Sequence, residues 1–416
     1  MCESKDPFRL ADELCRTQSP QQGELKGRYE GGEHQWLGMR GATLACEQLG
    51  IPVESLRRLQ RRAADVALTY GEIVALSGDF YPSPKELFEE TPSRWSWIWE
   101  QNDLSDLRRL FTEELTWIED EHRARSAGYP DNNLAFWWNA KSYLELAEKN
   151  EAHFGWHNVV AYCEHHACAL GYAMQAREQS PDDEHWRRAL YYNGFADHFL
   201  TDGFAAGHVR VPRAEISAWG ASIGYGGELS GLLAKVLHDQ DGHVKTAHAR
   251  GESKLDEDEG LPVRNSLGVE WSTRCDGQLF LVPRGEASAL IAEPVAAVAA
   301  SLTEVYEAQQ HKRLPAGEYR ALAYVPFPHP DAPTLAQKFH ELPEAQIKEL
   351  LRGCRWYTKL PFVKARLDEA KIARLFAELP QLMSSFASHV RAEYAASERL
   401  QLRLPRPYVD AFSHIA

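Results

Sequence analysis

The sequence lacks several features that would place it in a familiar class at once. No apolar run reaches the roughly 18 residues that a membrane-spanning helix needs, so no transmembrane segment is expected. The N-terminus is polar and has no apolar segment of the kind that marks a secretory signal. The seven cysteines are scattered and include no Cys-x-x-Cys pair, which argues against a disulfide framework and against a thiolate zinc site.

Basic residues are also scarce relative to acidic ones. The chain has 46 lysines and arginines against 60 aspartates and glutamates, which gives a net charge of -14. Capture of nucleic acid relies on cationic side chains that neutralise phosphates, so no nucleic acid partner is expected. Apolar residues make up 44% of the 416 residues, enough for a substantial core.

Helical periodicity dominates the chain. Apolar residues recur at three- and four-residue spacing, which predicts helices, in segments 53–76, 158–179, 185–207, 294–312, 344–360 and 369–400. Pro380 is expected to kink or split the last of these helices. A polar, acidic loop over 251–259 precedes a β-branched and aromatic stretch, 261–283, that predicts a small β-hairpin or meander. The expected fold class is therefore mainly α, a multi-helix bundle with a small β-hairpin insertion and extra C-terminal helices.

One stretch, "NGFADHFLTDGFAAGHVRVPR" at 193–213, combines His198, Asp202 and His208 with apolar and small residues. His198 and Asp202 are four residues apart, so a helix would place both side chains on one face. Imidazole and carboxylate together suit zinc or another first-row metal. His208 would point roughly 120° away from that face of a continuous helix. Either the helix bends at Gly203 or Gly207, or His208 serves a different metal ion, and we favour the second.

A single histidine in such a helix is more often a core residue bonded to a backbone carbonyl than a metal ligand. The complete pattern is more specific, and the stretch "HFLTDGFAAGHVRVPR" resembles the zinc-dependent phospholipases C. Their fold is shared with the zinc-dependent single-strand nucleases, but this stretch is more similar to the bacterial and fungal phospholipases. The resemblance implies a mostly helical fold and three zinc ions, two of them bridged by Asp202 and the third apart.

The resemblance also implies ligands elsewhere in the chain. Asp79 in "ALSGDFYPSP" and His153 in "NEAHFGWHN" would join His198 and Asp202 around the first zinc. His34 in "GEHQWLGMRGATLA" would bind the zinc that shares Asp202. The phospholipase relatives complete that site with an N-terminal tryptophan, and no tryptophan precedes His34 in this chain, so the remaining ligands there stay open.

The separate zinc would take His208, a later histidine and a carboxylate. "AKVLHDQDGHV" offers His238 with Asp241, the preferred pair, or with Asp239. The alternative pair is His248 with Glu252, one helical turn apart. The remaining histidines, such as His166 and His389, are expected to be structural.

The activity that the resemblance implies is that of a phospholipase C. It would hydrolyse the glycerol-side phosphodiester bond of glycerophospholipids, phosphatidylcholine foremost, to diacylglycerol and a phosphorylated head group. Asp79 and Asp202 would be the catalytic carboxylates, with Asp79 a general base as well as a ligand. Arg210 and Arg213 follow the motif directly, and they would either bind phosphate or pair with the ligand carboxylates.

The substrate would be a phospholipid at a membrane or micelle surface, and the resemblance implies export from the cell. Tryptophan clusters at 95–99 and 137–138 suit a membrane interface or a choline group, although packing in the core or in loops explains any one of them. Residues 1–250 would form the helical zinc-binding domain, 251–290 the acidic loop and β region, and 291–416 a C-terminal helical region that can pack into the same domain. A nuclease or nucleotidase with the same metals, and a non-catalytic helical protein, are the alternatives.

Overall fold

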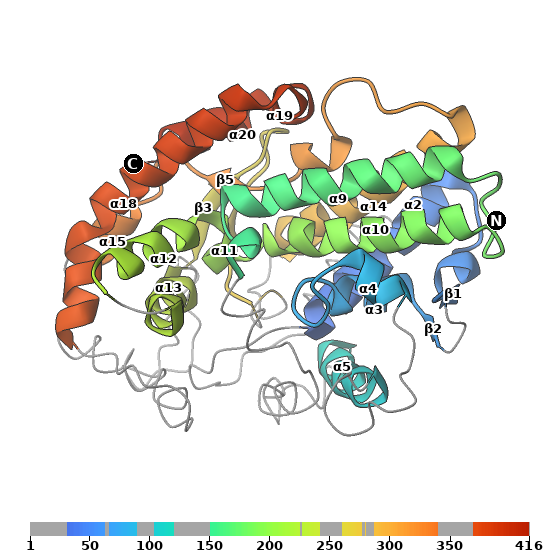
Figure 1. Ribbon diagram of the computed structural model, residues 1–416, viewed down its shortest axis with the longest axis horizontal. Coiled ribbons are helices and arrows are strands. Elements are labelled where there is room, and N and C mark those ends of the chain that lie inside the picture. The colour runs from blue at the N-terminus through green and yellow to red at the C-terminus, as the bar shows by residue number, and fades with distance from the viewer. Residues whose placement is uncertain are drawn as a thin grey trace.

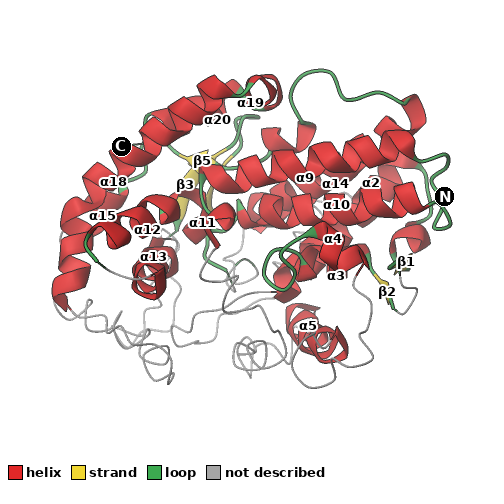
Figure 2. Ribbon diagram, viewed as in Figure 1, coloured by secondary structure: helices red, strands yellow, loops and turns green. Residues whose placement is uncertain are grey.

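The computed structural model describes residues 31–62, 66–89, 104–119, 150–224, 227–241, 260–276, 279, 287–339 and 369–415. Helices make up most of this part of the chain, as Figure 2 shows, so the mainly α fold class is confirmed. The tryptophan clusters, the acidic loop, the helix expected over 344–360, His248 and Glu252 lie outside the described residues.

The α-helices are α2 (Gly31–Leu49), α3 (Tyr70–Leu76), α4 (Pro84–Glu89), α5 (Leu104–Glu119), α9 (Trp156–Gln175), α10 (Glu184–Asp202), α11 (Ala206–Arg210), α12 (Arg213–Ser222), α13 (Gly227–Asp241), α14 (Ala287–His311), α15 (Leu335–Phe339), α18 (Glu369–Ala396), α19 (Glu398–Arg403) and α20 (Arg406–Ser413). Short 3-10 helices are η1 (Val53–Leu56), η2 (Asn150–His153) and η4 (Arg320–Ala323). The strands are β1 (Leu59–Gln60), β2 (Ala67–Leu68), β3 (Leu261–Arg264), β4 (Glu270–Thr273) and β5 (Phe327–Pro328).

The centre of the molecule is the pair α9 and α10, which lie side by side (Figure 1). Helices α3 and α14 also pack on α10, and α14 packs on α2 and α9 as well. Because neighbours cover α10 on several sides, every residue from Asn193 to Asp202 is buried. Its polar residues must therefore find partners inside the protein, since a buried polar group without one is costly. Those partners form the site described below.

The predicted long helix over 53–76 is wrong. Among the described residues of this segment, α3 is the one α-helix, and η1 and the antiparallel pair of β1 and β2 precede it. The helix starts late because Thr69 caps it. The Thr69 side chain accepts a hydrogen bond from the Glu72 backbone N–H, and the Glu72 carboxylate accepts one from the Thr69 backbone N–H. This reciprocal cap fixes the first turn at Tyr70.

The other described helices follow the predicted periodicity more closely. The segment 158–179 corresponds to α9, 185–207 to α10 and α11, 294–312 to α14, and 369–400 chiefly to α18. Pro380 does not split α18, which continues as one helix from Glu369 to Ala396. Proline removes a single backbone donor, and the burial of Leu375, Leu379 and Phe386 on one side keeps the helix packed.

The predicted hairpin is confirmed. Strands β3 and β4 pair antiparallel, with Val263 opposite Trp271. The Asn265 side chain closes the turn by accepting hydrogen bonds from the backbone N–H groups of Leu267 and Val269, both at 3.0 Å. Strand β5 adds to the free side of β3, far along the chain, and local patterning gave no sign of it.

Helix α14 contains the stretch Ala289–His311, the one helix of the described residues that is long and apolar enough to cross a membrane. However, 83% of its most apolar window is buried inside the protein. Core helices of globular proteins pass the same test, so this helix is weak evidence for a membrane span.

Candidate metal centre

The candidate ligands of the motif at 193–213 are divided between two helices, α10 and α11. Helix α10 ends at Asp202, Gly203 is its C-cap, and the short helix α11 starts at Ala206. His208 therefore lies on a different helix from His198 and Asp202. The helix is interrupted at Gly203, as the first alternative expected, and His208 also belongs to a separate group that could hold an ion, which is consistent with the second.

The Asp202 carboxylate lies among three imidazoles from three elements. Its Oδ1 is 3.3 Å from Nε2 of His34 on α2. Its Oδ2 is 2.7 Å from Nδ1 of His153, at the end of η2, and 3.7 Å from Nε2 of His198, one turn earlier on α10. The two oxygens therefore face different histidines, and a carboxylate in this position can contact two metal ions at once. His34, His198 and Asp202 form one group that could hold an ion.

Asp79 joins this arrangement from the turn after α3. Its Oδ2 is 3.9 Å from His198 Nε2, and Asp79, His153 and His198 form a second group that could hold an ion. Gly78 makes the close approach possible. It has a φ of 71°, and a Cβ at this position would lie 2.7 Å from ring atoms of both His153 and His198. A larger residue would push the turn, and Asp79 with it, away from the histidines.

The second cluster surrounds one carboxylate oxygen. Oδ2 of Asp276 lies 3.1 Å from Nε2 of His208 and 2.9 Å from Nε2 of His238. Gly207 lets α11 approach α13 closely, because any side chain there would overlap the His238 ring. These three residues form a third group that could hold an ion. His208 and His238 thus meet as predicted.

Asp241 is not the carboxylate of this cluster, and the prediction that it is a ligand is corrected. Its side chain is fully buried and pairs with Arg210, whose Nε and Nη2 atoms donate to the two carboxylate oxygens at 2.8 and 2.7 Å. The buried guanidinium needs a counter-ion, and Asp241, at the end of α13, supplies it. The side chain of Asp239 lies outside the described part of the molecule.

The same pair decides between the two roles left open for Arg210. Its remaining Nη1 donates to the carbonyl oxygen of Pro333 at 2.6 Å, so each of its nitrogens has a protein acceptor. Phosphate binding by Arg210 is therefore corrected to a structural role. Arg213 is also buried, and its guanidinium lies 5.1 Å from the centre of the Phe154 ring.

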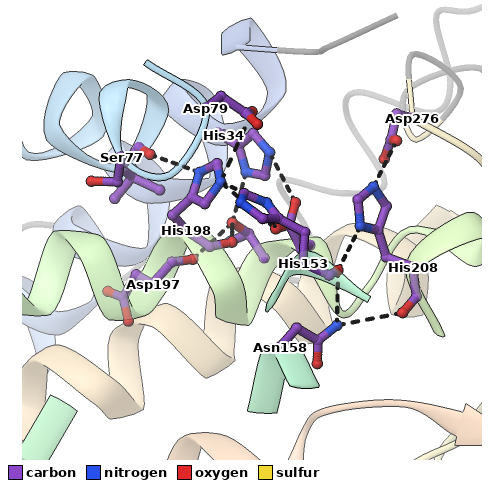
Figure 3. A network of polar contacts seen from close by, with 12 residues as sticks. His34, Ser77, Asp79, His153, Asn158, Asp197, His198, His208 and Asp276 are labelled. Atoms are coloured by element: carbon purple, nitrogen blue, oxygen red, sulfur yellow. Dashed lines mark hydrogen bonds and ion pairs between the residues drawn. The ribbon is translucent and has the colours of Figure 1, made fainter. Parts of the chain in front are cut away.

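Outer contacts orient the imidazoles. Nδ1 of His198 is 3.1 Å from the carbonyl oxygen of Val74, and Nδ1 of His208 is 2.7 Å from that of His153. Nδ1 of His34 is 2.8 Å from the Thr201 hydroxyl, which itself donates to carbonyl oxygens of its own helix. Each contact places a proton on Nδ1 and directs Nε2 at the carboxylates. The contact between His208 and the His153 carbonyl also joins the two clusters (Figure 3).

The buried carboxylates differ in their electrostatics. Burial alone would raise the pKa of Asp202, but His198 and His153 lower that pKa well below its usual value. Burial likewise opposes ionisation of Asp276, but His208 and His238 hold its pKa far below the usual range. For Asp79, burial raises the pKa to about 6, and Asp202 adds to this shift. Two anionic carboxylates at neutral pH thus lie among imidazoles, which is the charge pattern that attracts a divalent cation.

Asp276 is the ligand candidate that reasoning from the sequence missed. In the sequence it stands before a glycine within the predicted β stretch, a pair that indicates only a turn. It lies 68 residues beyond His208 and 38 beyond His238, so no helical spacing links the three. Only the packing of β4 near α11 and α13 brings it there. The contact that marks this packing is a hydrogen bond from the Ala206 N–H to the carbonyl oxygen of Arg274.

Comparison with family models, with curated proteins and with solved structures gives no match to this chain. Its function is therefore inferred from the two clusters themselves and from the motif that supplies them.

Proposed function

We propose that this protein is a zinc-dependent phospholipase C, which hydrolyses the glycerol-side phosphodiester bond of glycerophospholipids such as phosphatidylcholine. One observation carries the proposal. The two oxygens of Asp202 face histidines from different elements, with His34 on one side and His153 and His198 on the other. The resemblance to zinc phospholipases C leads us to expect a carboxylate shared by two ions at this position, and the arrangement around Asp202 supports that expectation.

The donor atoms favour zinc. The three groups that could hold an ion consist of imidazole nitrogens and carboxylate oxygens, at buried or half-buried positions. Zinc takes these ligands in sites of three or four, whereas magnesium and calcium prefer all-oxygen sites. One ion would lie on the His34 side of Asp202, a second among Asp79, His153 and His198, and a third at the His208 cluster. The bound form would hold three zinc ions.

When bound, zinc would lower the pKa of a water molecule and offset charge that develops on the phosphoryl oxygens. The chain's own contribution is to hold the ligands rigidly and to restrict the access of bulk water, because the side chains of the cluster are buried or half-buried. The Asp79 carboxylate is suited to accept a proton from the attacking water at Oδ2. Because the Arg210 guanidinium is paired with Asp241, we assign binding of the substrate phosphate to the metal ions that the cluster would hold.

A lipid substrate fits the charge of the protein better than a nucleic acid. The net charge of -14 opposes the approach of a polyanion, whereas a phosphatidylcholine surface is zwitterionic and carries no net charge. The nuclease with the same metal cluster remains the rival activity and is an outcome of the test.

The test is zinc analysis of the purified protein together with assays on phosphatidylcholine micelles and on single-stranded DNA. We expect at least three zinc ions per chain, the three of the proposed centre, and release of phosphorylated head group that a chelator abolishes and added zinc restores. Asp202→Asn should lose this activity, and Asp331→Asn is the matched control because the Asp331 side chain is 91% exposed. Hydrolysis of DNA but not lipid would support the nuclease, and absence of bound metal would overturn both activities.

A further inference from the structure

A fourth group of candidate ligands lies outside the centre, where α18 meets the start of α9. His157 is on the first turn of α9, and His389 and Glu393 are one turn apart on α18. Each residue offers one ligand atom, and the three atoms lie within 4.8 Å of one another. The rings of His157 and His389 are 5.0 Å apart, and His389 Nε2 is 3.4 Å from Glu393 Oε2. None of the three belongs to the clusters around Asp202 and Asp276.

An ordinary surface ion pair explains only part of this arrangement. His389 and Glu393 are four residues apart on an exposed helix, and such pairs contribute little to stability. Glu393 also accepts a hydrogen bond from the Trp156 indole N–H at 2.6 Å. Neither contact involves His157, whose Nε2 is buried and makes no hydrogen bond among the described residues. A buried imidazole nitrogen without a partner is unfavourable, so the structure leaves a donor or acceptor position that an ion would fill.

The geometry suits a tetrahedral ion after a small adjustment. Zinc ligands at about 2.1 Å from the metal lie roughly 3.4 Å from one another. The present separation of up to 4.8 Å therefore has to shrink by up to about 1.4 Å. The His389 side chain is 48% exposed and free of close packing on one side, so a change of its rotamer can provide that movement. Glu393 has two carboxylate oxygens and can keep the Trp156 hydrogen bond while it binds.

We infer that His157, His389 and Glu393 form an additional zinc site that ties the C-terminal helix α18 to α9. Because its ligands come from two helices, the ion would act as a clip between them, with water completing its coordination. This inference stands apart from the phospholipase activity, because it uses none of the residues assigned to that activity.

The clip would act next to the catalytic turn. Phe386, one turn before His389, lies against Gly155, where a Cβ would come within 3.0 Å of its ring. The Gly155 N–H donates to the carbonyl oxygen of His208 at 2.6 Å. Gly155 also follows His153 by two residues. A fixed α18 would therefore hold in place the turn that carries His153 and that is hydrogen-bonded to His208 of the other cluster.

The experiment uses the full chain, stripped with a chelator and dialysed against buffered free Zn²⁺. Bound zinc is measured for the wild type, His389→Ala and Glu393→Gln, with His311→Ala as the control because His311 is exposed and belongs to no ligand group. We expect the two α18 variants to bind about one zinc fewer per chain than the wild type and the control. Hydrogen exchange of the amides of 369–396 should slow on zinc addition in the wild type and the control alone.

Repeating the measurement in an Asp202→Asn background separates this inference from the proposed function. There the catalytic zinc ions are weakened, and the His389→Ala substitution should still remove about one equivalent. Equal zinc binding with and without His389 would overturn the site. Loss of one zinc without any change in the exchange of α18 would overturn the tether. Failure of the lipid assay would affect neither result.

Discussion

The clusters around Asp202 and Asp276 differ in where along the sequence their candidate ligands come from. Around Asp202, four candidate ligands come from local sequence features, namely a helical four-residue spacing for His198 and Asp202 and short segments next to helices for Asp79 and His153. Around Asp276, one ligand comes from a turn after a hairpin, and helical spacing pointed instead to Asp241, which the fold uses to neutralise Arg210. Spacing identifies ligands that share an element. The spacing rule fails at Asp241, because the buried guanidinium of Arg210 pairs with this carboxylate instead.

The largest effect should come from Asp202→Asn. The amide cannot bridge two cations as a carboxylate does, so both ions that share it would be weakened. Bridged metals contribute several kcal/mol to the stabilisation of the transition state, which corresponds to a loss of activity on the order of 10³-fold or more. Lipid hydrolysis at saturating zinc measures it. Activity close to that of the wild type would contradict the bridging role of Asp202 and remove the basis of the comparison.

The comparison itself is tested by Asp276→Asn and Asp241→Asn. Asp276→Asn should lose the zinc bound by His208 and His238, and with it the lipid-hydrolysing activity. The stability of the metal-free protein should change little. Asp241→Asn leaves a buried guanidinium without a counter-ion, which should lower the free energy of unfolding by about 3 kcal/mol. Zinc content per folded molecule should stay at the wild-type level. Zinc analysis and urea unfolding separate the two variants, and the reverse pattern would restore Asp241 as the ligand.

Much of the fold follows from the sequence because the strongest signals are local. Helices α9 and α10 have long, regular apolar periodicity, and the turn of the hairpin carries its asparagine. The late start of α3 also had a signal, since Thr69 and Glu72 are three residues apart, as a capping box requires. Strand β5 and the place of Asp276 had none. Both depend on packing between segments far apart in the chain, which no spacing rule describes.

A smaller effect is expected from Thr201→Val, which removes the acceptor for Nδ1–H of His34 and keeps the shape of the side chain. Loss of such an outer contact typically weakens metal binding by about 10- to 100-fold. The control is Thr303→Val, because Thr303 is buried on α14 and donates to the carbonyl oxygen four residues earlier, as Thr201 does. Zinc affinity from competition with a chelator measures the difference. Equal affinities of the two variants would show that the Thr201 contact does not support His34.

The smallest expected effect concerns the stability of the protein at acid pH. It compares His208, which pairs with the Asp276 carboxylate, with His165, which makes no ion pair among the described residues. Asp276 raises the pKa of His208 to about 9 despite the opposing effect of burial. Burial lowers the pKa of His165 to about 4, and this ring stacks on Phe199 at 5.6 Å. Above the ordinary pKa of about 6.5, His165 is neutral in both folded and unfolded chains and adds no pH dependence.

Between pH 6.5 and 4, the unfolded chain takes up a proton at His165 that the folded protein rejects. The free energy of unfolding should therefore fall as the pH falls through this window, by up to about 3 kcal/mol from this residue. In His165→Phe that contribution disappears, so the chelated variant should lose less stability than the chelated wild type between pH 7 and pH 4.5. Urea unfolding at both pH values measures this difference, and chelation removes the separate effect of losing bound zinc in acid. Parallel losses in both proteins would mean that His165 is protonated as easily in the folded protein as in the unfolded chain, and that its contact with Phe199 does not exclude water.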